Sequence, residues 1–143
     1  MNTVLVLKPP QMLRFVAIVD GRNQPVFFQS APETPPNVAM NQQFIAEMSL
    51  DFVEQQLPQL QSQLHRPHLI VIHDGIVVYA LLTNTRTKYI LGFGSTVEPD
   101  RVDASLRAVA DAYTGYQCSP FGKKDGPIQS SKFENKIEEI ITG

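Results

Sequence analysis

The sequence lacks the features that mark secreted and membrane-spanning proteins. Cys118 is its only cysteine, so no internal disulfide can form, and no Asn-x-Ser/Thr glycosylation site occurs. The longest apolar run, residues 76–82, is far shorter than a membrane span, and the amino end has neither a signal-peptide core nor a glycine for myristoylation. No carboxy-terminal cysteine box for prenylation is present. These absences predict a cytoplasmic protein that associates with membranes only through a partner.

An excess of charge of one sign is also missing. The formal net charge is −2 and the two signs are interspersed, which argues against a nucleic-acid partner and against direct binding to an anionic membrane. With 143 residues, 43% of them hydrophobic, and no internal repeat, the chain fits one globular domain. We expect a single domain over residues 1–143, in which residues 1–12 form a flexible amino-terminal extension.

Five segments rich in β-branched and aromatic residues predict strands, at 14–20, 25–30, 68–74, 76–83 and 88–94. The "GRNQ" turn joins the first two as a hairpin. Asp74-Gly75 is a tight-hairpin signal, and residues 84–87 supply another short turn, so the last three strands must pair antiparallel.

Three helices are predicted between and after the strands, which gives the order ββαβββαα and an α+β fold. The three prolines of "APETPPN" (31–37) exclude helix, so the first helix begins near Asn41, and Pro58 ends or kinks it. Pro99 fits the start of the second helix. Ser131 and Glu134 predict a capping box at the start of the third.

The first helix carries more apolar surface than one sheet face requires. Its apolar residues span an arc of roughly 200°, whereas an ordinary surface helix needs only about 100°. Two interpretations remain open: the helix lies deep in a groove of its own domain, or one flank packs on the sheet and the other on a second protein. In the second case Phe44, Met48 and Asp51 border the docking surface, and Asp51 can receive an arginine from the partner.

The histidines and glycines do not form a site for chemistry. His68 and His73 are five residues apart on one predicted strand, so they point to opposite faces and a metal site with His65 is not expected. Gly92-Phe93-Gly94 lacks the third glycine of a dinucleotide fingerprint, and the next helix does not open directly from it. We expect a strand end that approaches another backbone.

The stretch "YQCSPFGKKDGPIQSSKF" (116–133) resembles a phosphate-binding loop only in composition. No Ser or Thr follows Lys123-Lys124, and no strand leads into the stretch. Cys118 could act as a nucleophile only with a nearby histidine, and we expect a small, buried, structural cysteine instead. Phe121, Ile128 and Phe133 are spaced to pin the crossing between the last two helices to the core.

Three stretches together resemble the sedlin family, the longin-like small subunits of the TRAPP tethering complex. They are "QFIAEMSLDFVE" (43–54), "LLTNTRTKYIL" (81–91) and "YTGYQCSPFGKKDGPIQSSKFENKI" (113–137). The third is the most specific, because the family pattern of Pro-Phe, a variable loop and Pro-Ile-x-Ser-x-x-Phe is present. Its motif residues here are Cys118, Pro120, Phe121, Pro127, Ile128, Ser130 and Phe133. Thr83-Asn84 and Cys118 resemble the sedlin-like paralogue, in fungi the TRAPP-complex-associated protein, more than sedlin itself.

The resemblance implies a longin-like (SNARE-like) fold, with a five-stranded antiparallel sheet, the first helix on one face and the two carboxy-terminal helices on the other. It implies a subunit with no catalytic residues, cofactor or metal. Exchange activity on Rab GTPases belongs to the assembled complex, and small subunits contribute assembly and stability. The paralogue is associated with the large subunits of the larger, Golgi-acting form, which implies peripheral association with Golgi membranes.

Two alternatives remain. The first is another longin-type regulatory module, which binds a SNARE or coat peptide between helix and sheet; a SNARE itself would need a heptad-bearing helix and a membrane anchor after Gly143. The second is a small nucleotide-binding enzyme, which the missing acid–base and phosphate geometry disfavours. A thermal-shift screen with nucleotides and metals separates an enzyme from a binding module.

Overall fold

The computed structural model describes residues 12–95, 97–120 and 126–143. The elements are β1 (Leu13–Val19), β2 (Pro25–Ser30), α1 (Pro36–Gln55), α2 (Leu57–Ser62), β3 (His68–His73), β4 (Ile76–Leu82), β5 (Lys88–Phe93), α3 (Pro99–Cys118) and α4 (Ser131–Thr142). The predicted order ββαβββαα is confirmed, with the short helix α2 added after α1. Predicted residues 1–11 of the amino-terminal extension lie outside the described part.

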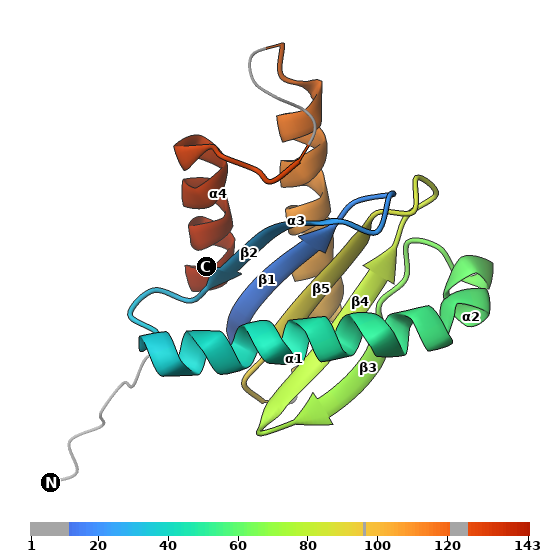
Figure 1. The fold of residues 1–143 in the computed structure, drawn as a ribbon, viewed down its shortest axis with the longest axis horizontal. Coiled ribbons are helices and arrows are strands. Elements are labelled where there is room, and N and C mark those ends of the chain that lie inside the picture. The colour runs from blue at the N-terminus through green and yellow to red at the C-terminus, as the bar shows by residue number, and fades with distance from the viewer. Residues whose placement is uncertain (1–11, 96, 121–125) are drawn as a thin grey trace, which may run out of the picture.

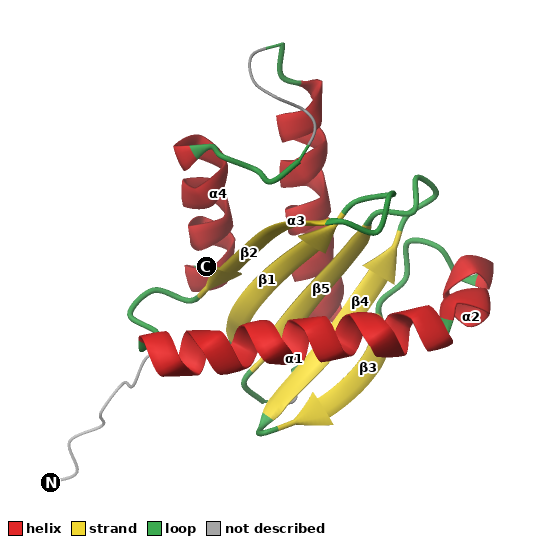
Figure 2. Ribbon diagram, in the orientation of Figure 1, coloured by secondary structure: helices red, strands yellow, loops and turns green. Residues whose placement is uncertain are grey.

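The five strands form one antiparallel sheet in the order β2-β1-β5-β4-β3. Helix α1 crosses one face of the sheet, and α3 and α4 cover the other (Figure 1). The first and last strands of this order, β2 and β3, are the sheet edges (Figure 2). This arrangement confirms the longin-like α+β fold expected from the sequence.

Alternating strand residues supply two hydrophobic cores, one on each face of the sheet. On β1, Phe15 and Ala17 pack toward α1, whereas Val16 and Ile18 pack toward α3 and α4. Central strand β5 is buried along its whole length because helices cover both of its faces. The sheet therefore holds α1 on one side without help from the carboxy-terminal helices.

The predicted hairpin between β3 and β4 is confirmed by its backbone. Asp74 has φ 51° and Gly75 has φ 74°, the left-handed conformations that a tight two-residue hairpin turn requires. Between β1 and β2, the Asp20 carboxylate accepts hydrogen bonds from the amides of Arg22 and Gln24, at 3.0 and 2.9 Å. Short polar turns therefore fix the strand registers.

The predicted start of the first helix needs correction, whereas its predicted break is confirmed. Helix α1 begins at Pro36, more than one turn before Asn41. Proline is tolerated there because the amides of the first helical turn have no hydrogen-bond acceptor within the helix. The stretch "APETPPN" therefore does not exclude helix at its end. Pro58 does interrupt the helix as predicted: α1 ends at Gln55, and Pro58 stands in the first turn of α2.

The prediction that Ser131 caps the last helix is wrong by one residue. The cap is Ser130, whose hydroxyl accepts a hydrogen bond from the amide of Phe133 at 3.2 Å. Ser131 is already the first residue of α4. The local sequence offers two adjacent serines, and the position at which Phe133 enters the core decides which one caps.

Gly92 makes room for a side chain, not for another backbone as predicted. A Cβ at this position would lie 2.1 Å from the Phe15 ring, and Gly92 is the direct cross-strand partner of Phe15. At Gly94 a Cβ would meet the Arg14 side chain at 2.6 Å. The absent side chain of Gly92 therefore lets Phe15 fill the core beneath α1.

Candidate partner-binding surface on the first helix

Helix α1 buries one face and leaves the other open to solvent. The buried positions are Gln42, Ile45, Ala46, Ser49 and Val53. They repeat at helical spacing and face the core between α1 and the sheet, where α1 lies mainly on β3 and β5. The apolar arc is therefore not fully used by the domain, and the deep-groove interpretation does not account for its outer part.

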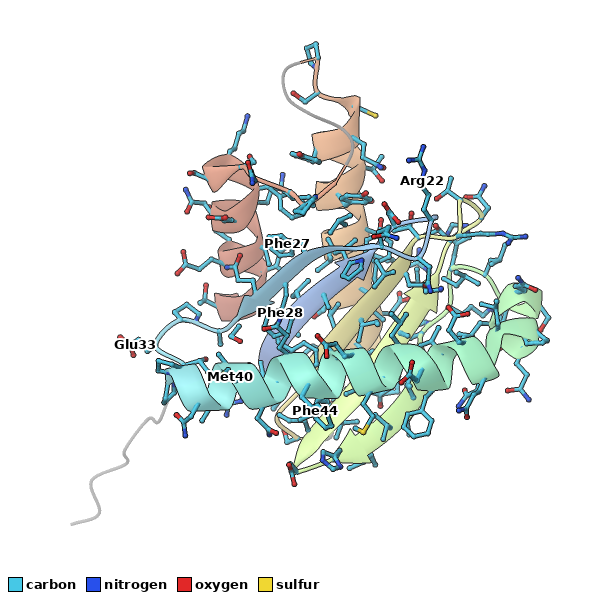
Figure 3. The ribbon with its side chains drawn as sticks, in the orientation of Figure 1. Arg22, Phe27, Phe28, Glu33, Met40 and Phe44 are labelled. Carbon is cyan, nitrogen blue, oxygen red and sulfur yellow. The ribbon has the colours of Figure 1, made fainter. Side chains whose placement is uncertain are left out.

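Four apolar side chains at a spacing of four residues form a ridge that runs from the solvent face of α1 toward the sheet, where its last member packs against the core; it is here called the α1 ridge: Met40, Phe44, Met48 and Phe52. Met40 is 74% exposed and Phe44 57% exposed, whereas Met48 and Phe52 are half-buried. Figure 3 shows Met40 and Phe44 side by side along α1. Large exposed apolar side chains in a row are typical of protein-binding surfaces. The predicted Phe44 and Met48 lie on this ridge.

Asp51 lies beside the α1 ridge, one turn after Met48. It is exposed, and among the described residues no hydrogen bond or ion pair holds its carboxylate. Glu47 precedes it by one turn, so this flank of the helix is acidic. A guanidinium from another chain could reach the Asp51 carboxylate while an apolar side chain covers Phe44. The three predicted residues thus share one face of one helix.

An ion pair between a buried lysine and a partly exposed glutamate fixes α1 on the sheet. The Lys88 ammonium at the start of β5 donates to the carboxylate of Glu54, and also to the side-chain oxygen of Asn23 at 2.7 Å. At the other end of the helix, the Ser30 hydroxyl donates to the Gln42 side-chain oxygen at 2.7 Å. The α1 ridge is therefore presented by a helix held at both ends.

The sequence analysis missed Lys88 and the apolar residues on β3. Lys88 reaches Glu54 across 34 positions of the chain, so no local pattern reveals the pair. Leu69 and Ile72 are exposed and pair with Tyr79 and Val77 on the sheet face that α3 and α4 cover elsewhere. The sequence analysis predicted the strand but made no prediction about which of its side chains stay exposed.

The motif between the last two helices is structural where it is described. Ile128 and Phe133 are buried in the core beneath α3 and α4, and the Ile128 amide donates to the Val26 carbonyl at 2.8 Å. Pro120 and Pro127 are exposed. Phe121 and the Lys123-Lys124 pair lie outside the described residues. Ile128 and Phe133 therefore pin the crossing to the sheet as predicted.

Cys118 is exposed, which corrects the expectation of a buried cysteine. It is the last residue of α3, and at 100° per residue it lies half a turn away from the buried Val109. The helix therefore turns Cys118 toward solvent. No histidine of the described residues forms an interaction with it.

The described residues contain no group of three or more His, Cys, Asp or Glu side chains that could hold a metal ion. His73 lies 3.4 Å from the carboxylate of its neighbour Asp74, on the solvent side of the β3–β4 hairpin. No helix in the described part of the chain is long and apolar enough to cross a membrane.

Burial perturbs the pKa of two tyrosines that lie between β5 and α3. Burial raises the pKa of the Tyr89 phenol far above its ordinary value, and the nearby Tyr113 adds to this. Burial also raises the pKa of Tyr113. The two rings meet edge to face, with centroids 6.1 Å apart, between β5 and α3. Both phenols belong to the core, so their perturbation concerns stability.

Comparison with known proteins gives two matches that cover most of the chain. The family model described as sedlin matches residues 18–142. The trafficking protein particle complex subunit 2-like protein of Xenopus tropicalis is 24% identical over 135 residues, covering 88% of this chain and 94% of the relative. The sedlin match includes α1 and the described part of the motif between α3 and α4.

Proposed function

The chain belongs to the sedlin family, and we propose that it is a non-catalytic subunit of the trafficking protein particle complex, TRAPP, in which it supports assembly or stability. The family consists of non-catalytic components of a complex, so the chain acts by binding and not as an enzyme. The name of the frog relative supports the choice of complex.

One observation carries the proposal: the α1 ridge is exposed beside an unpaired carboxylate on a helix that is otherwise fixed. Phe44 is 57% exposed in the free chain. Fully burying a phenylalanine side chain is worth about 1.5–3 kcal/mol. An arginine that pairs with Asp51 adds a charge-assisted hydrogen bond of about 1.5–3 kcal/mol. These are the properties of a small number of residues that dominate an interface.

The mechanism is surface complementarity without a change in the fold. An apolar side chain of a neighbouring subunit covers Phe44 and Met48, while an arginine of that subunit meets Asp51. Because Lys88 and Ser30 hold the helix at its two ends, little conformational entropy is lost when the partner binds. The chain then serves as a preformed docking element.

In the cell this role places the chain in vesicle tethering. We propose that its partners are large subunits of the Golgi-acting form of the complex, and that it supports Rab GTPase activation by stabilising that form. Association with Golgi membranes then occurs through the complex, in transport between the endoplasmic reticulum and the Golgi and through the late Golgi.

Affinity purification of the tagged full chain from its own cells, with mass spectrometry, tests the assignment. Recovery of other subunits of the tethering complex in constant proportion is the expected result. Recovery of the chain with no other tethering subunit would contradict it. Stable recovery of a SNARE or coat protein alone would instead support a peptide-binding longin module.

A further inference from the structure

The outer edge of β2 offers backbone hydrogen-bonding groups to another strand. Directly after β2, the Ala31 amide donates to the Arg14 carbonyl at 2.8 Å, so Ala31 and Arg14 are a hydrogen-bonded pair. In the same register Ala17 lies opposite Phe28. Because hydrogen-bonded and non-hydrogen-bonded pairs alternate in an antiparallel ladder, the amide and carbonyl of Phe28 point away from β1. The same holds for Ser30.

One position of this edge is already hydrogen-bonded. The Ile128 amide donates to the Val26 carbonyl at 2.8 Å. Further along, β2 has no second strand neighbour, and no backbone hydrogen bond to Phe28 or Ser30 on this side is found within the described residues. Within the described residues this edge is therefore hydrogen-bonded at Val26 and open at Phe28 and Ser30.

A pocket of about 300 Å³ opens along the unpaired part of the edge, between β2 and α4; we call it the β2–α4 groove. Its lining residues are Phe27, Phe28, Gln29, Glu134, Asn135 and Glu138. Figure 3 shows Phe27 and Phe28 as successive residues of β2, with α4 beyond Phe27. The Gln29 side-chain amide donates to the Glu134 carbonyl at 3.3 Å and ties the two walls together.

The groove is acidic and aromatic. Glu134 and Glu138 are exposed, lie one turn apart on α4, and have carboxylates without a hydrogen bond or ion pair among the described residues. No basic side chain lines the groove. Arginine suits these walls better than lysine, because its planar guanidinium can bind two carboxylates through several N–H groups and can also stack on an aromatic ring.

We propose that the β2–α4 groove binds an extended, arginine-bearing peptide segment of another protein. The segment adds as a strand to the free edge of β2 at Phe28 and Ser30, and its arginine lies between Glu134 and Glu138. Strand addition supplies affinity through the main chain, and the acidic pocket selects the side chain. This site uses neither the α1 ridge nor Asp51, so it stands apart from the proposed docking of α1.

The test uses the full chain and a fluorescein-labelled hexapeptide of sequence Thr-Val-Arg-Val-Thr-Val, with fluorescence anisotropy as the readout. We expect the arginine peptide to bind at least about tenfold more tightly than the matched peptide with glutamate in place of arginine. E134Q/E138Q should lower its affinity about tenfold. E139Q, on the same helix but outside the groove, should leave the affinity unchanged.

Backbone methylation distinguishes strand addition from binding of a lone cation. Peptides N-methylated at alternate residues, in the two possible registers, lose the donors of one strand edge each. We expect one register to abolish binding and the other to retain it. Equal binding of both registers, equal binding of the glutamate peptide, or an equal loss in E139Q would overturn the proposal.

Discussion

Lys88 and Glu54 form an ion pair that joins the central strand β5 to the outer helix α1. The lysine side chain is 7% exposed and the glutamate side chain 40% exposed. Asn23, in the turn between β1 and β2, accepts a second hydrogen bond from the same ammonium group at 2.7 Å. Through this one cation, the turn, the central strand and α1 are held in one arrangement.

Replacing Glu54 by glutamine should destabilise the domain. Removal of one partner from a fully buried pair costs about 3–5 kcal/mol. Because Glu54 is partly exposed and water can reach the site, we expect the free energy of unfolding to fall by about 1–3 kcal/mol, as measured by urea denaturation. Glu47→Gln, on the same helix without a partner among the described residues, should change the free energy of unfolding by less than about 0.5 kcal/mol. Equal effects of the two substitutions would show that the pair does not anchor the helix.

The position of the α4 cap gives a second prediction. Ser130→Ala removes the acceptor for the Phe133 amide and should lower the free energy of unfolding by about 1 kcal/mol. Ser131→Ala removes a hydroxyl that makes no such bond and should have a much smaller effect. Thermal or chemical denaturation of both variants measures the difference. A larger loss for Ser131→Ala would restore the assignment made from the sequence.

Gly92→Ala should destabilise the sheet core, since the new methyl group would lie 2.1 Å from the Phe15 ring. Overpacking of this kind costs about 1–3 kcal/mol. Gly115→Ala is the matched control, because nothing lies within 4 Å of the added Cβ on α3. There, helix propensity predicts a gain of about 0.8–1 kcal/mol. In denaturation experiments we expect the free energy of unfolding to fall in Gly92→Ala and to rise in Gly115→Ala.

Alkaline pH should destabilise the fold through Tyr89 and Tyr113. Burial raises the pKa of both phenols in the folded state above the unfolded value of about 10. The unfolded chain then loses these protons first, so the stabilisation is fully present below about pH 10 and is lost as the pH rises above it. Tyr89→Phe should flatten the fall in the free energy of unfolding between about pH 10 and 12. An unchanged slope would contradict this origin.

Local chemistry was enough to predict the strands. The turn residues and the β-branched runs placed each strand within one residue at both ends, for example 68–74 against the observed His68–His73. Pro58 likewise marked the break between α1 and α2. These features depend on neighbours along the chain, and a sequence contains that information directly.

Features that depend on contacts far along the chain were missed or misjudged. The length of α3 decides that Cys118 faces solvent, and the entry of Phe133 into the core decides that Ser130 caps α4. The Lys88–Glu54 pair joins two residues 34 positions apart in the chain, so no local pattern shows it. For the candidate site, the width of the apolar arc predicted spare surface on α1, but only the sheet contacts show that Phe44 remains exposed.

The most direct test of the central claim measures complex assembly by variants of the α1 ridge. Tagged full chains carrying Phe44→Ala or Asp51→Ala replace the cell's own copy, and the co-purified tethering subunits are quantified by mass spectrometry. Ile72→Ala is the matched control, because Ile72 is 64% exposed but lies on β3, on the other face of the sheet. Denaturation of each purified variant should show a change of less than about 1 kcal/mol, so that lost binding is not lost folding.

The account predicts that Phe44→Ala and Asp51→Ala each reduce recovery of the neighbouring subunit by about tenfold or more, while Ile72→Ala retains it. Recovery of every tethering subunit at wild-type levels with both α1 variants would contradict the assignment of this helix as the docking surface.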